Sequence, residues 1–176
     1  MASFQDRVVG AMRLNVATFE EVEHDASATV QAAIVVGAAA LSSGLASGLG
    51  PAVFGTIVGL IGWAIGAFVL LMVGTKLLPG RNTQADYGQM LRALGFAQAI
   101  GLFGILTIIP LLGWLIWFVI QVWVLVTMVI AVRQALDYDS TMRAVITCVV
   151  AWVIMIVISM VFAVFGFGAA MVGSAF

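Results

Sequence analysis

Long apolar stretches, separated by short clusters of charged residues, are the main pattern along this chain. No charge lies between Asp25 and Lys76, a gap of 50 residues, or between Arg92 and Arg133, a gap of 40. The 33 residues after Arg143 are also uncharged. A helix needs roughly 20 residues to cross a bilayer core of about 30 Å. The first two gaps therefore each predict a pair of crossing helices, and the third predicts one.

The helix-breaking residues indicate where each pair turns. Small and polar residues gather between positions 42 and 51, ending in Gly50 and Pro51. Pro110 divides the second gap, and the residue before a proline is disfavoured in a helix. We therefore expect an all-α membrane bundle with spans near residues 27–47, 52–77, 91–109, 111–133 and 143–168, in a domain of residues 26–176 that follows an N-terminal segment of residues 1–25.

Composition supports a membrane protein. Hydrophobic residues make up 64% of the chain and charged residues 9%, against roughly 25% charged in soluble domains. The net charge of −1 argues against nucleic-acid binding, which depends on positive charge. His24 is the only histidine and has no obvious serine or cysteine partner, so we expect neither an enzyme nor a resident cofactor.

The charges also predict an orientation. With five spans, every basic residue falls on the same side of the membrane, and so do the acidic residues. Positively charged loops stay in the cytoplasm. The N-terminus is therefore predicted to be cytoplasmic and the C-terminus to lie outside. The basic residues are Arg7, Arg13, Lys76, Arg81, Arg92, Arg133 and Arg143.

The N-terminal segment combines an amphipathic stretch with an acidic one. Apolar side chains recur at helical spacing through residues 4–12, which predicts a short helix that could lie in the membrane interface. Glu20, Glu21 and His24 follow at spacings that place carboxylates and an imidazole along one helix face, as a divalent metal requires. The alternative is a solvated or capping role, because runs of charge are usually exposed.

Several polar residues near the predicted cytoplasmic ends are candidates for binding a protein partner or an anionic lipid. Arginines at helix ends can reach lipid headgroups, and tyrosines are common at membrane interfaces on physical grounds alone. Both the docking and the interface interpretations stay open. The candidates are Asp86, Tyr87, Arg92, Arg133, Asp137 and Tyr138.

Two further patterns lie within the spans. The second span has glycines on one face, Gly55, Gly59, Gly62 and Gly66, and small residues let helices approach closely in lipid. We expect packing within the subunit, with a homo-oligomer seam or a glycine-lined conduit as alternatives. Gln98 and Gln121 should lie at similar depth on either side of Pro110, where they could bond each other or contact a substrate.

Three stretches resemble the Yip family of Ypt/Rab-interacting membrane proteins, in its short bacterial type. They are residues 15–25 (NVATFEEVEHD), 87–97 (YGQMLRALGFA) and 132–138 (VRQALDY). The resemblance implies five spans, a cytoplasmic N-terminus and a place in the bacterial plasma membrane. Eukaryotic members of the family bind Rab GTPases and have an Asp-Leu-Tyr-Gly-Pro type motif, which is absent from this sequence.

These observations favour a non-enzymatic membrane protein that organises the bilayer or docks a partner or lipid through its cytoplasmic face. A small transporter or channel is the first alternative, since glycines and glutamines lie inside the spans. An accessory subunit of a larger membrane complex is the second.

Overall fold

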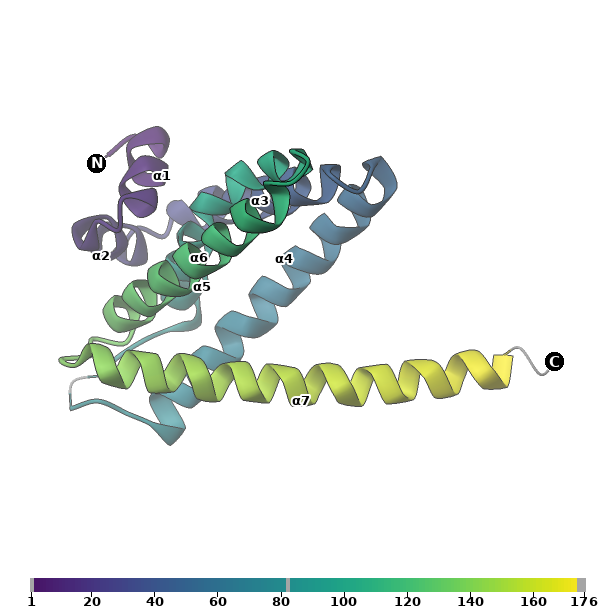
Figure 1. Cartoon of the computed structure of the whole chain (residues 1–176). Coiled ribbons are helices and arrows are strands. Elements are labelled where there is room, and N and C mark those ends of the chain that lie inside the picture. Colours follow the sequence, from purple (N-terminus) through teal and green to yellow (C-terminus); the bar gives the residue numbers. More distant parts are fainter. Residues whose placement is uncertain (1, 82, 174–176) are drawn as a thin grey trace.

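The computed structural model is all-helical over the residues it describes, 2–81 and 83–173, with side chains described as far as residue 163 (Figure 1). The described part of the chain contains no strand. In chain order the elements are α1 (Phe4–Met12), α2 (Val16–His24), α3 (Ala28–Leu45), α4 (Leu49–Met72), the π-helix η1 (Val73–Leu77), α5 (Tyr87–Ala97), the 3-10 helix η2 (Ala99–Ile108), α6 (Gly113–Ala135) and α7 (Thr141–Gly173).

Within the described part of the chain, five helices are long and apolar enough to cross a membrane. The expected all-α class, with five such helices after a short amphipathic helix, is confirmed. Gly48 adopts φ +108° in the turn between α3 and α4, a conformation that glycine reaches at little cost. The candidate spans are Ala28–Leu45, Leu49–Leu77, Tyr87–Ile108, Gly113–Ala135 and Thr141–Ala163.

The third span differs from the regular helix that its composition predicts. It is α-helical only to Ala97 and continues as the 3-10 helix η2. In a 3-10 helix, residues three apart line up, so Gly101 and Gly104 lie in one row. Ser42 of α3 supports this backbone, since its Oγ donates to the Leu102 carbonyl (2.8 Å) and accepts from the Ile105 N–H (2.9 Å).

The α5–η2 span packs closely against α3 because both surfaces are made of small residues. A Cβ added to Gly95 would lie 2.6 Å from the Cβ of Ala32, and one added to Gly101 would lie 3.0 Å from the Cβ of Ala39. Ala32 and Ala39 are buried. Without a hydrophobic driving force in lipid, such close contact is what holds helices together.

The hairpin formed by α1 and α2 packs against the bundle. Ala11, Phe19 and Val22 are fully buried, and the Nε1 of Trp123, halfway along α6, donates to the Met12 carbonyl (2.9 Å). Helix α1 therefore does more than cover the membrane interface, the location that its amphipathic pattern suggested. It buries the guanidinium of Arg7, which bonds Glu21 of α2 (2.9 Å) and Gln31 of α3 (3.1 Å).

Candidate functional site

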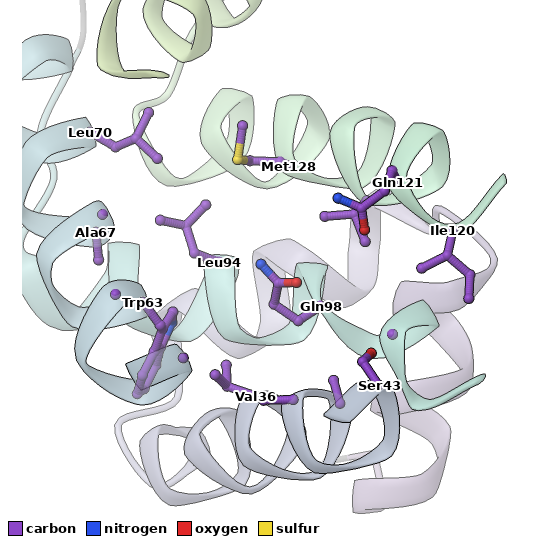
Figure 2. Close-up of a pocket in the computed structure, with 17 residues that line it drawn as sticks. Val36, Ser43, Trp63, Ala67, Leu70, Leu94, Gln98, Ile120, Gln121 and Met128 are labelled. Atoms are coloured by element: carbon purple, nitrogen blue, oxygen red, sulfur yellow. The ribbon is translucent and has the colours of Figure 1, made fainter. Parts of the chain in front are cut away.

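A cavity of about 320 Å³ lies inside the bundle, lined by α3, α4, the α5–η2 span and α6 (Figure 2). Most of its wall is apolar, including Val36, Leu70 and Ile120. Among the described residues that line it, none is charged. Its volume is at the lower end of the range for small-molecule sites, roughly 300–1,000 Å³.

Gln98 and Gln121 are the two amide side chains in this cavity. Figure 2 shows Gln98 entering it from the α5–η2 span and Gln121 from α6. A hydrogen bond between them, one of the two roles that the sequence left open, is absent from the described bonds, and neither side-chain amide has a partner among the described residues. The nearest indole, that of Trp63, is already engaged, because its Nε1 donates to the Leu91 carbonyl (3.1 Å).

The glycines of α4 line this cavity more than they pack. Gly59, Gly62 and Gly66 all contribute to its wall. Only Gly59 has a neighbour where a Cβ would be, the Ala40 Cβ at 3.2 Å, whereas Gly55, Gly62 and Gly66 have none within 4 Å. The expectation that all four glycines form a packing face is therefore not supported by these contacts. Closely packed glycines lie elsewhere, on the α5–η2 span and also at Gly44 of α3, where an added Cβ would lie 2.5 Å from the Ala52 Cα.

A second hollow, of about 550 Å³, lies where α6 ends and the chain turns toward α7. We call it the polar groove. Two exposed carboxylates, Asp137 and Asp139, line it together with the half-buried Arg133. The Arg133 guanidinium donates to the Tyr138 carbonyl (3.3 Å) and the Thr141 hydroxyl (3.2 Å). The other lining residues are Gln84, Gln134 and Tyr138.

The two tyrosines and Asp86 have structural partners. The buried Tyr138 hydroxyl lies 3.2 Å from the Gly74 carbonyl and 2.8 Å from the Leu78 carbonyl, at the end of η1. The more exposed Tyr87 donates to the Ala64 carbonyl (2.8 Å). Asp86 caps α5, accepting from the Gln89 N–H (2.8 Å). Of these residues, only Tyr138 contributes to the polar groove.

Arg92 is buried, so it is not placed to meet a lipid headgroup or a partner. Its Nε donates to the carbonyls of Val22 (3.0 Å) and Glu23 (3.1 Å), and its Nη2 also donates to Glu23. Its Nη1 lies 3.4 Å from the Thr29 hydroxyl. The last carbonyls of a helix lack intrahelical hydrogen-bond donors. The Arg92 guanidinium provides such donors at the end of α2.

Comparison with known proteins agrees with this architecture. A family model described as the Yip1 domain matches residues 11–171. The chain belongs to the Yip family. No curated protein and no solved structure matches it. The match covers all five candidate membrane-crossing helices up to residue 163, so this Yip-family protein is an integral membrane protein.

The Yip-family chain does not bring the predicted metal ligands together. Glu21 accepts hydrogen bonds from Arg7, and the His24 Nδ1 lies 2.8 Å from the Glu20 carbonyl. Within residues 2–81 and 83–163, no group of three or more histidine, cysteine, aspartate or glutamate side chains is placed to hold a metal ion. The Glu20, Glu21 and His24 hypothesis is therefore not supported by the geometry.

Two buried charged residues were not singled out from the sequence. Arg7 ties α1 to Glu21 and Asp25, and Glu23 is buried with its Oε2 unpartnered. Burial raises the pKa of the Glu23 carboxyl to about 7, and the charges of Asp137 and Glu20 act in the same direction. Helical spacing could have predicted the burial of Glu23, because Glu23 lies one turn after the buried Phe19 on the same face of α2.

Proposed function

We propose that this Yip-family protein is non-enzymatic and organises the membrane by docking a partner protein through the polar groove, on the cytoplasmic side. The observation that carries the proposal is the pair of exposed carboxylates, Asp137 and Asp139, in a groove of about 550 Å³. We assign the groove to the cytoplasmic side because the basic residues are expected to stay in the cytoplasm.

The charges of the groove favour a basic partner segment. Arg133 is the one basic residue among the described lining residues, and its Nε and Nη1 donate to neighbouring oxygens. Asp137 and Asp139 are exposed. Complementary charges guide association and fix its register, so a lysine- or arginine-bearing segment suits this surface better than an anionic headgroup does.

A photo-crosslinking residue at Gln84, an exposed position in the groove, tests this in the native membrane. We expect a crosslink to a basic segment of another membrane protein, weakened by salt. Asp137→Asn with Asp139→Asn should reduce the yield by about tenfold, a change of roughly 1.4 kcal/mol. Asparagine suits position 137, because that residue has φ +50° and asparagine tolerates this region.

Glu20→Gln is the matched control, since Glu20 is exposed and lies outside the groove lining. It should leave the crosslink unchanged. Crosslinks to lipid alone, or a protein crosslink indifferent to both aspartates, would overturn the proposal.

A further inference from the structure

The intramembrane cavity contains two amides that the protein itself leaves without partners. Each amide has a carbonyl oxygen and two N–H donors, and the described hydrogen bonds nearby use neither Gln98 nor Gln121 through its side chain. A polar group without a partner in an apolar environment costs free energy, on the order of 1–3 kcal/mol. A ligand that bonds these amides would recover that cost.

The cavity is not sealed from the bilayer. Gln121 is exposed, and Gly62 and Gly66 across the cavity are half-buried. Gln121 lies eight residues after Gly113, the first residue of α6, which places it about 12 Å along the helix at 1.5 Å per residue. This position is well inside the apolar length of α6. Helix α1 covers α6 at Trp123, which lies on nearly the opposite face from Gln121. On the Gln121 side we therefore expect lipid hydrocarbon outside the cavity.

We infer that this cavity binds an uncharged amphipathic lipid, with the lipid's ester or hydroxyl group bonded to Gln98 and Gln121. The absence of charge from the described lining argues against an ionised headgroup, which is costly to bury without a counter-charge. The apolar wall of Val36, Leu70 and Ile120 suits a hydrocarbon chain. A small polar solute would gain too few hydrogen bonds here.

This site is independent of the polar groove. The described residues that line the cavity and those that line the polar groove do not overlap. Loss of lipid binding in the cavity therefore need not affect partner docking at the groove. The probe is a diacylglycerol that carries a photoactivatable diazirine in its acyl chain, mixed into phosphatidylcholine vesicles containing the full-length protein. Labelled positions are mapped by mass spectrometry of peptides.

Two glycines on the same helix give a matched pair of variants. A Cβ added at Gly66 or at Gly55 meets nothing within 4 Å, but only Gly66 lines the cavity. Gly66→Leu fills the space, and Gly55→Leu adds the same side chain elsewhere on α4. We expect Gly66→Leu to reduce labelling of the cavity wall by about tenfold or more, and Gly55→Leu to label as the wild type does.

The glutamines test the polar contact. Gln98→Leu and Gln121→Leu keep the side-chain size and remove the amide, so each should lower labelling of the cavity wall by about fivefold, equivalent to one hydrogen bond of about 1 kcal/mol. These variants also keep the proposal testable if Gly66→Leu fails to fold. Labelling that is spread over lipid-facing residues and unchanged in every variant would overturn it. Flux of entrapped glycerol without labelling of the cavity would do the same and would favour transport.

Discussion

At the scale of the residue, Arg92 shows how a charge at the end of a span can be structural. Its guanidinium bonds carbonyls at the end of α2, 69 and 70 residues away in sequence. The chain around position 92 contains no sign of this, because the acceptors are backbone atoms of a distant helix. Sequence pattern could place Arg92 near a membrane boundary and could not identify its partners.

Arg92→Met should therefore destabilise the protein more than Arg133→Met does. Removing the Arg92 guanidinium leaves buried carbonyls unpaired, which we expect to cost on the order of 2–3 kcal/mol, whereas the half-buried Arg133 should cost about 1 kcal/mol or less. Thermal unfolding in detergent measures both. Hydrogen exchange should also quicken in α2 for Arg92→Met. Equal destabilisation by the two variants would contradict the capping role.

Glu23 should make the stability of the protein depend on pH. Its carboxyl has a pKa of about 7 in the folded chain against an ordinary 4.5, so the folded state binds the proton more tightly than the unfolded state does. The free energy of unfolding should then fall as pH rises from about 4.5 to about 7, by on the order of 3 kcal/mol. The charged groups facing Glu23 are His24, Asp137, Glu20 and Arg92.

Unfolding midpoints recorded at several values of pH between 5 and 8 check this. Glu23→Gln should remove most of the decline and be the more stable protein at pH 8. His24 contributes in the same direction, because a hydrogen bond to the Glu20 carbonyl raises its pKa. Asp139→Asn removes an exposed carboxylate that is not among the charged groups acting on Glu23 or His24, so it should retain the wild-type profile. A flat wild-type profile would mean that Glu23 does not titrate in this range.

At the scale of the element, the spans could be predicted well and their internal geometry could not. An uncharged stretch of 20 or more apolar residues has few alternatives to a crossing helix. The charge gaps, divided by the helix-breaking residues, therefore located α3, α4 and α6. The change to a 3-10 helix after Gln98 depends on Ser42 of another helix. Likewise, glycine spacing indicated a helix face on α4 without indicating what that face would meet.

Glycine substitutions should distinguish the two kinds of glycine. A Cβ at Gly95 would lie 2.6 Å from the Ala32 Cβ and 3.1 Å from its backbone Cα, so Gly95→Ala must push α5 away from α3 and should cost roughly 1–3 kcal/mol. Gly55 has open space around it. Gly55→Ala should be neutral or stabilise by up to about 1 kcal/mol, through helix propensity.

Thermal unfolding of the two alanine variants in the same detergent is the measurement. The order of stability, Gly55→Ala above Gly95→Ala, is the expected result. The opposite order would show that the close packing of the third span against α3 contributes little to the fold.

At the scale of the whole molecule, the distribution of charge predicts opposite sides for the two kinds of connection. Ser47 lies in the uncharged turn between α3 and α4, and Arg81 lies in the charged connection before α5. The single native cysteine, Cys148, is buried, which leaves a low labelling background. In intact cells, a maleimide that cannot cross membranes should label Ser47→Cys and spare Arg81→Cys, with the reverse in inverted vesicles.

Arg81→Cys removes one basic residue, so Thr83→Cys serves as a charge-preserving control in the same connection. Labelling of both connections from the same side would contradict the five-span arrangement. If the reagent instead labelled the Arg81 connection and spared the Ser47 turn in intact cells, the five-span arrangement would stand and the predicted orientation would be reversed.

The hydrogen bond between Trp123 and the Met12 carbonyl joins residues 111 positions apart. Helix α1 precedes all five candidate spans in the chain, yet the indole that bonds its end is synthesised only after three of these spans and half of a fourth. During synthesis the ion pairs of Arg7 with Glu21 and Asp25 can form within the α1–α2 hairpin and the residue that follows it. The contact of α1 with Trp123 can form only after α6 has been made. Docking of the hairpin on the bundle is consequently a late step of assembly, and it can report whether the spans before it have come together.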